Sequence, residues 1–240
     1  MSIISLIKTL PKNFKELTIN NDNSFKFYIV HYDILIDRKQ NLLKQFNENQ
    51  IINEIYFVTD YKRDNICYDD IKLFNLNYIS IGSCAITLSH LLCYYKLVKS
   101  NDNFCLIFED DVILNNKYNE TLLHYISQLP EDWDMFLIGD GCGLHIPKDI
   151  INEKNKNVFL KDNYPSSWGG NGATRCTDSY LISKKCAHKI LLNLNENTKI
   201  SQNIDWWLND IIRSLELKVY WGEPTIVTQG TQNGIYNTSH

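Results

Sequence analysis

An apolar run that leads directly into three acidic residues constrains the fold of this chain more than any other feature. Residues 104–108 are apolar, Glu109, Asp110 and Asp111 follow, and apolar residues resume over 112–114. A short continuous apolar run is typical of a strand buried on both faces, as in parallel sheets. Three adjacent carboxylates there repel one another and lose hydration, which is tolerable when a divalent cation or several hydrogen-bond donors lie among them. The alternative is an acidic turn that only closes a strand.

Three other apolar, β-rich segments also end in a small or acidic residue: 25–32 before Asp33, 54–58 before Thr59-Asp60, and 135–138 before Gly139-Asp140. The stretches between them have helical periodicity. This alternation predicts an α/β fold with a mainly parallel central sheet flanked by helices. The carboxyl ends of parallel strands meet at one edge, where open α/β sheets bind ligands. We therefore expect a site for a metal ion and a polar ligand at that edge, formed by Asp33, Asp60, Glu109 to Asp111 and Asp140.

Length and composition fit a single globular domain. We place this domain at residues 25–240 of the 240-residue chain, after an N-terminal extension of residues 1–24. The hydrophobic fraction is 44% and the charged fraction 22%, both ordinary for a globular protein. The net charge of −4 gives no reason to expect a nucleic acid or an anionic membrane as a partner. The longest apolar runs are shorter than a bilayer span, so we expect no transmembrane segment.

The first residues and the cysteines indicate the compartment. Residues 1–23 lack the long apolar stretch and the small-residue cleavage site of a signal peptide. The seven cysteines are scattered and form no CxxC pair, so we predict small core residues in a reducing compartment. Together these patterns predict a cytoplasmic protein.

The segment before the acidic strand has the pattern of a helix over residues 84–100, with Gly82-Ser83 as the break before it. Ser89 and His90 then lie near its start. Helix amino ends attract phosphate groups, so this pair could help to hold a diphosphate. The alternative is that His90 is an ordinary surface or core residue.

Residues 203–215 predict a strongly amphipathic helix. Apolar residues recur there at helical spacing: Ile204, Trp207, Leu208, Ile211, Ile212 and Leu215. Asp205 falls in the first turn, where acids often only complement the helix dipole. Trp206 lies about a hundred degrees away from the apolar stripe, on a polar face. A large aromatic side chain beside a carboxylate is a common platform for a sugar ring, and we favour that interpretation for Asp205 and Trp206.

These motifs, in this order, resemble the family 25 glycosyltransferases, which include lipopolysaccharide-core and collagen galactosyltransferases. The resemblance covers about residues 25–230 and rests on the segments 82–91, 106–112, 132–139, 177–187, 204–207 and 224–229. Two positions depart from the family pattern. Ala85-Ile86 replaces a common Gly-Cys pair, and residues 29–32 read Ile-Val-His-Tyr instead of Ile-Asn-Leu, although Asp37-Arg38 still follows.

The resemblance implies a GT-A type nucleotide-sugar-binding fold. It also implies an inverting, metal-dependent transfer of a hexose, galactose or glucose, from a UDP-sugar to a hydroxyl of a glycan or of a glycosylated or hydroxylated protein. A Mn²⁺ or Mg²⁺ ion held by carboxylates would stabilise the charge that develops on the leaving UDP. Asp111 is the first candidate ligand, Glu109 the second, and His240 a third from the chain end. Asp110 is expected to face away, because neighbouring side chains diverge.

The remaining roles follow from the same picture. Asp205 is our candidate for the general base, with Asp140 second, and Trp206 is the candidate acceptor platform. The donor-binding candidates are His31, Arg38, Asp60, Ser89, His90, Glu109, Asp110 and Asp111. Two alternatives are a metal-dependent phosphohydrolase with a strand-end aspartate nucleophile and an inactive, transferase-like carbohydrate-binding module.

Overall fold

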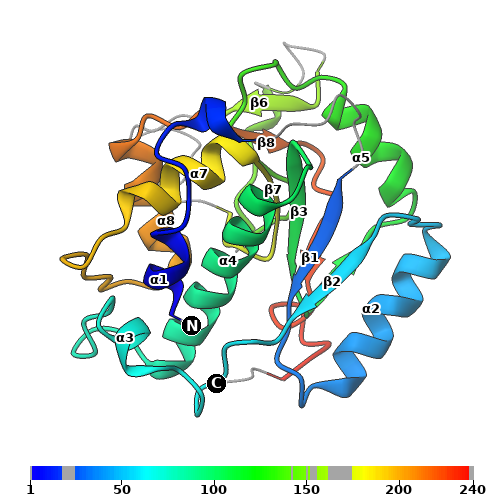
Figure 1. The fold of residues 1–240 in the computed structure, drawn as a ribbon. Coiled ribbons are helices and arrows are strands. Elements are labelled where there is room, and N and C mark those ends of the chain that lie inside the picture. The colour runs from blue at the N-terminus through cyan, green and yellow to red at the C-terminus, as the bar shows by residue number, and fades with distance from the viewer. Residues whose placement is uncertain are drawn as a thin grey trace.

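A seven-stranded sheet forms the centre of the protein in the computed structural model (Figure 1). The structure describes residues 2–17, 25–141, 143–149, 151, 156–161 and 175–237. The order across the sheet is β2 (Ile55–Val58), β1 (Lys26–Val30), β3 (Phe104–Glu109), β7 (Ser179–Ser183), β5 (Met135–Leu137), β8 (Val219–Gly222) and β6 (Val158–Leu160).

Most of these strands run in one direction. β1 pairs in parallel with β2 and β3, and β5 pairs in parallel with β8. β7 lies antiparallel between β3 and β5, and β6 is antiparallel to β8. The predicted α/β fold with a mainly parallel central sheet is therefore confirmed. The antiparallel β7 was not predicted, and it brings the start of one strand to the edge where the parallel strands end.

Helices cover both faces of the sheet (Figure 1). One face carries α1 (Ile3–Ile7), α4 (Ile81–Lys99), α7 (Lys184–Asn193) and α8 (Ile204–Ser214). The other carries α2 (Ile36–Glu48) and α5 (Tyr118–Ile126). The short helices η1 (Phe14–Glu16) and α3 (Tyr68–Ile71) lie in connections. Cys105 and Ile107 of β3 pack toward α4, whereas Leu106 and Phe108 pack toward α2. This double burial explains the continuous apolar run before the acids.

Helix α4 begins earlier than predicted. Ser80 is its N-cap, and the Ser80 hydroxyl accepts a hydrogen bond from the Ser83 amide. Gly82 and Ser83 therefore lie inside the first turn rather than in a break. The predicted start at residue 84 was wrong because a serine cap outweighs the weak helix propensity of one glycine. Ser89 consequently lies about two turns into the helix and not near its amino end.

Within the described residues, α4 also has the length and composition of a membrane-spanning helix. However, 67% of its most apolar window is buried inside the protein. From the sequence we expected no apolar segment of that length. The difference arises because the polar residues inside α4 are mostly uncharged and interrupt the apolar runs without making the helix as a whole polar.

Two other predictions concern α8 and the cysteines. Helix α8 covers Ile204–Ser214 and buries its apolar stripe, which confirms the predicted amphipathic helix. Cysteines 84, 93, 105 and 186 are buried, as expected for core thiols, whereas Cys67 is exposed.

The N-terminal residues join the main core. Ile3, Ile7 and Leu10 are buried in the hydrophobic cluster that also contains the apolar face of α4. The domain boundary at residues 24/25 stays a prediction.

A second, two-stranded sheet lies next to the end of β3. Its strands β4 (Val112–Leu114) and β9 (Val227–Gln229) pair in an antiparallel manner. The Gly230 amide donates to the Asp111 carbonyl at 2.7 Å, so the C-terminal segment is fixed against the acidic turn between β3 and β4.

Candidate active site

The turn between β3 and β4 directs its acidic side chains into two different environments. Asp110 faces the end of β1 and the start of α2. One carboxylate oxygen accepts from His31 Nδ1 at 2.8 Å and from the Tyr32 amide at 3.1 Å. The other oxygen accepts from Arg38 Nη1 at 2.8 Å. Asp110 is thus buried with a donor for each oxygen, in agreement with the expectation that it faces away from its neighbours.

The charge of Asp110 is well stabilised. Burial alone would raise the pKa of Asp110, but the hydrogen bonds from His31 and Arg38 outweigh it and hold the pKa below its usual value. His31 and Arg38 were predicted to bind the donor. His31 Nδ1 and Arg38 Nη1 instead form hydrogen bonds to Asp110. The donor-binding roles of both residues stay predictions.

Asp111 has fewer partners. It is only 3% exposed, and its Oδ2 accepts from the Thr231 hydroxyl. Its Oδ1 is buried without a hydrogen-bond partner among the described residues. Burial, and to a smaller extent the neighbouring Glu109, raises the pKa of Asp111. Loss of hydration with a donor to only one of its two oxygens makes this carboxylate a strong candidate for a cation ligand.

Glu109 borders the same region from the end of β3. Its Oε1 accepts from the Thr177 hydroxyl at 2.8 Å. His90 Nε2 lies 3.5 Å from the same oxygen. His90 itself is fully buried, and its Nδ1 is 2.8 Å from the Tyr180 hydroxyl. Because Ser89 and His90 lie well inside α4, they are not at a helix terminus as we had expected, and their donor-binding role stays a prediction.

Behind Glu109 and Asp111 lies a carboxyl group that the sequence analysis missed. Asp178 is fully buried and accepts from the Ser179 hydroxyl at 2.7 Å. Burial, together with the negative charges of Glu109, Asp111 and Asp140, raises the pKa of Asp178 well above its usual value. The available signal was Thr177-Asp178 directly before the β-rich segment 179–183. It was overlooked because only strand ends, not strand starts, were expected at this edge.

The predicted edge therefore forms only in part. Asp140 is half-buried, its Oδ1 has no hydrogen-bond partner among the described residues, and its charge acts on Asp178. Gly139, before it, has no room for a side chain, since a Cβ there would lie 2.3 Å from Asp178 Oδ2. Asp33 instead pairs with Lys62 at 2.6 Å on the surface. Asp60 is exposed.

Asp205 and Glu109 line one cleft of about 230 Å³. Its other lining residues are Ser83, Ile86, Cys176, Thr177, Asn203, Ile204, Gln229 and Gln232. Asp205 lies in the first turn of α8, and burial raises the pKa of its carboxyl group. The next residue, Trp206, is 51% exposed, whereas Trp207 is 8% exposed. Periodicity therefore predicted the orientation of both tryptophans correctly, and the acceptor-platform role of Trp206 stays a prediction.

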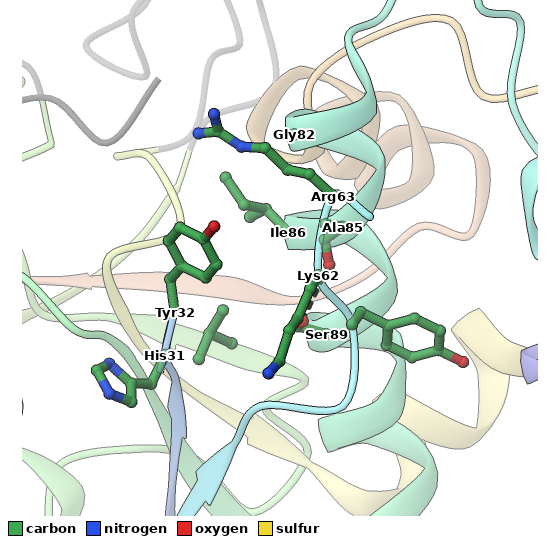
Figure 2. Close-up of a pocket in the computed structure, with 10 residues that line it drawn as sticks. His31, Tyr32, Lys62, Arg63, Gly82, Ala85, Ile86 and Ser89 are labelled. Atoms are coloured by element: carbon green, nitrogen blue, oxygen red, sulfur yellow. Dashed lines mark hydrogen bonds between the residues drawn. The ribbon is translucent and has the colours of Figure 1, made fainter. Parts of the chain in front are cut away.

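A smaller pocket of about 60 Å³ shares the lining residue Ile86 with this cleft. Figure 2 shows the residues that line this smaller pocket. Tyr32, after β1, and Arg63, after β2, extend beside the first turns of α4. The Arg63 guanidinium is 5.9 Å from the centre of the Tyr32 ring. The absence of a side chain at Gly82 admits Arg63, whose Nε would lie 3.1 Å from a Cβ there. The remaining lining residues are Val30, His31, Tyr61, Lys62, Ala85 and Ser89.

The C-terminal segment closes over the anchored side of the acidic turn. Arg38 Nη2 donates to the Asn237 carbonyl at 2.6 Å, and the Arg38 guanidinium lies 5.1 Å from the centre of the Tyr236 ring. His240, predicted as a metal ligand, lies outside the described residues.

The residues present fit a divalent cation of the Mg²⁺ or Mn²⁺ type. Among the described residues, no three His, Cys, Asp or Glu side chains form a ready metal site. Mg²⁺ is usually held by one or two carboxylates together with substrate phosphates rather than by an all-protein cage. Asp111, with an unpartnered buried oxygen, and Glu109, at the cleft, supply that kind of ligand set.

The sequence profile of glycosyltransferase family 25, described as LPS biosynthesis protein, matches residues 24–206, more than half of the chain. The chain belongs to this family. The mainly parallel α/β sheet agrees with the GT-A type of fold that the motifs implied. A comparison with curated protein sequences finds no significant match.

Several solved glycosyltransferase structures are similar at a low level. A Drosophila β-1,4-galactosyltransferase 7 mutant in complex with manganese, UDP-Gal and xylobiose has 8% identity and a TM-score of 0.46, covering 91% of this chain and 76% of that chain. A glycosyltransferase involved in glycosylation of the major capsid of PBCV-1 has 10% identity and a TM-score of 0.46, covering 86% and 94%. The galactosyltransferase LgtC with donor and acceptor sugar analogs has 12% identity and a TM-score of 0.45, covering 85% and 86%.

Proposed function

We propose that this chain transfers a hexose, galactose or glucose, from a UDP-sugar to a hydroxyl of a glycan or protein acceptor, with inversion and with a divalent cation. One observation supports this most. Glu109, from the end of β3, and Asp205, from the start of α8, line a single cleft, and Glu109 interacts electrostatically with the buried Asp111. A family of sugar transferases needs carboxylates there both for a cation and for a base, and these side chains come from segments far apart in sequence.

In this proposal the two pockets bind different parts of the donor. The small pocket offers the Tyr32 ring, together with Arg63 and Lys62, to a nucleoside. Aromatic faces and guanidinium groups stack on bases. The cleft beyond Ile86 then receives the diphosphate and the sugar, next to Glu109.

Asp111 and Glu109 would hold the cation. When bound, a Mn²⁺ or Mg²⁺ ion supplies Lewis-acid stabilisation of the negative charge on the leaving UDP. Without counter-charge the two carboxylates would repel the diphosphate, so we expect the protein to bind UDP poorly in the absence of divalent cations.

Asp205 acts as the general base in this proposal and takes the proton of the acceptor hydroxyl. Burial raises the pKa of Asp205, which brings its basicity closer to that needed for proton transfer near neutral pH. Its place in the first turn of a well-packed helix fixes its backbone. Asp140 is the second candidate. Trp206, exposed beside Asp205, is proposed to contact the acceptor sugar.

The experiment is a screen of UDP-sugars for UDP release, with Mn²⁺ or with EDTA, and with or without glycan acceptors. The proposal predicts release that requires the cation and increases with an acceptor. Release of inorganic phosphate from sugar phosphates would instead indicate a phosphohydrolase. Tight UDP-sugar binding with no turnover would indicate an inactive binding module. A cytoplasmic location stays part of the proposal and is tested by fractionation of the producing cells.

A further inference from the structure

Three buried aromatic side chains form a hydrogen-bonded chain that leads to Glu109. The Tyr94 hydroxyl lies 2.8 Å from the Tyr180 hydroxyl, which lies 2.8 Å from His90 Nδ1. All three side chains are at most 1% exposed. Tyr94 and His90 are one turn apart on α4, and Tyr180 lies on β7. The His90 and Tyr180 rings are nearly parallel, with their centres 5.8 Å apart, so packing as well as hydrogen bonding fixes the imidazole.

The direction of this chain follows from counting hydrogens. Burial raises the pKa of both tyrosines well above the usual value, so each hydroxyl keeps its hydrogen. If Tyr94 donates to Tyr180 and Tyr180 donates to His90 Nδ1, both tyrosine hydrogens have an acceptor, and the remaining hydrogen, on His90 Nε2, faces Glu109 Oε1 at 3.5 Å. In the reverse direction, Nδ1–H donates to Tyr180 and Tyr180 donates to Tyr94. The Tyr94 hydrogen is then left without an acceptor among the described residues.

The same count determines what His90 presents to Glu109. When Nδ1 accepts from Tyr180, a neutral imidazole carries its hydrogen on Nε2, and this atom lies 3.5 Å from Glu109 Oε1. The reverse direction would place the Nε2 lone pair against a carboxylate oxygen, which is repulsive.

We propose that Tyr180 and His90 are positioning residues that hold Glu109 by its Oε1 and leave its Oε2 for a ligand in the cleft. The Thr177 hydroxyl donates to Oε1 at 2.8 Å, so Thr177 and His90 both face the same oxygen of Glu109. Oε2 accepts no hydrogen bond from the described residues. The distance of 3.5 Å from Nε2 is longer than a hydrogen bond, and we expect it to shorten when Oε2 engages a cation. This inference rests on the proposed function for the identity of that ligand.

The first test needs neither turnover nor a donor sugar. Long-range ¹H–¹⁵N correlation spectra of the metal-free protein at neutral pH report which imidazole nitrogen carries the hydrogen. The His90 signals are assigned by their absence in His90→Gln. The proposal predicts a hydrogen on Nε2 and none on Nδ1. A hydrogen on Nδ1, or on both nitrogens, overturns it.

The second test measures Mn²⁺ affinity, with Mn²⁺ alone and with Mn²⁺ plus UDP, in matched variants. Tyr180→Phe and His90→Phe should weaken Mn²⁺ binding by about 10- to 100-fold, as loss of groups that orient a metal ligand commonly does. His90→Gln keeps an N–H in the region of Nε2 and should recover part of the affinity. Tyr94→Phe leaves Tyr180 able to donate to Nδ1, so it should change the affinity by no more than about threefold.

Tyr125→Phe is the control for loss of one buried tyrosine hydrogen bond, since its hydroxyl donates to the Pro224 carbonyl at 2.8 Å, away from Glu109. It should lower thermal stability as much as Tyr180→Phe does but leave Mn²⁺ affinity unchanged. If Tyr180→Phe and His90→Phe bind Mn²⁺ as the wild type does, or if Tyr125→Phe weakens binding equally, the positioning role is refuted. If the wild type binds Mn²⁺ but releases no UDP from any donor, the proposed function fails while both tests of the chain still apply.

Discussion

Asp110 and Asp111 are neighbours, and both are almost completely buried, at 7% and 3% exposure, yet they lie in opposite environments. On the anchor side of the turn, His31, Arg38 and the Tyr32 amide satisfy Asp110. On the cleft side, Asp111 keeps an unpartnered oxygen close to Glu109 and Asp178.

The pKa directions express this difference. That of Asp110 is lowered and that of Asp111 is raised. A buried carboxylate with donors on both oxygens favours the folded state, whereas a buried carboxylate among other acids is destabilised until a cation or a proton joins it. Burial alone therefore does not distinguish structural from functional acidic residues. The donors around each carboxylate do.

The largest effect is expected on the cleft side, at Asp205. Asp205→Asn keeps the shape and much of the polarity of the helix start, so the fold should persist. Transfer to the acceptor should fall by roughly two to four orders of magnitude with donor binding nearly unchanged. A base is active when deprotonated, and the pKa of Asp205 is raised, so wild-type kcat/KM should fall as the pH drops through that raised pKa. Kinetics at several pH values check this. A variant with near-normal transfer would move the base to Asp140.

Variants of the two tryptophans of α8 distinguish a side chain at the cleft from one in the core. Trp207→Ala should lower the free energy of unfolding by roughly 3–5 kcal/mol, as large core truncations do. Trp206→Ala should leave the thermal melt almost unchanged and raise the acceptor KM, because the ring is 51% exposed. Melting curves and acceptor titrations decide it. Equal destabilisation by both variants would remove the proposed acceptor platform.

On the anchor side, Asp110→Ala should lower the free energy of unfolding by about 3 kcal/mol, because Arg38 and His31 are left buried without their partner. Since the folded pKa of Asp110 is lowered, its contribution is complete at neutral pH and is lost as the pH falls through that pKa. Denaturant titrations from acid to neutral pH should show this acid-side loss in the wild type but not in the variant. Asp33→Ala, which breaks an exposed pair with Lys62, is the control and should change stability little. A similar small change at Asp110 would contradict the anchor assignment.

How much of this could be read from the sequence depends on whether the signal is local. The apolar run into Glu109 predicted a buried strand and its acidic end. The spacing from Ile204 to Leu215 predicted both the helix and the opposite orientations of Trp206 and Trp207. Each of these signals lies within one element, where period and burial are coupled directly.

The missed features depend on contacts between distant segments. Asp110 meets Arg38 across 72 positions, and Asp111 meets Thr231 across 120, so no local pattern indicates them. Asp178 was missed because β7 runs against its neighbours, and a strand direction is decided by pairing rather than by composition. The start of α4 was misplaced because Gly82 was weighed above the Ser80 cap.

A further stability effect concerns Asp178, which is fully buried near Glu109 and Asp111. Its folded pKa is raised, so the folded protein binds a proton that the unfolded chain releases, and stability should fall as the pH rises from about 4 toward that pKa. The slope is about 1.4 kcal/mol per pH unit. Asp178→Asn mimics the neutral carboxyl group, so this slope should disappear, and the variant should be at least as stable at neutral pH. Denaturant titrations in EDTA measure it. A variant that keeps the slope would assign the proton to another group.

We propose that Asp111 and Glu109, on the cleft side of the turn, bind the donor diphosphate by way of a cation, while Asp110 holds the turn in place. Calorimetric titration of UDP in the presence of Mn²⁺ tests it most directly. We predict clear binding to the wild type, no measurable binding in EDTA, and at least about a hundredfold weaker binding to a folded Asp111→Asn variant. Equal affinity in EDTA, or unchanged affinity in Asp111→Asn, would contradict the claim.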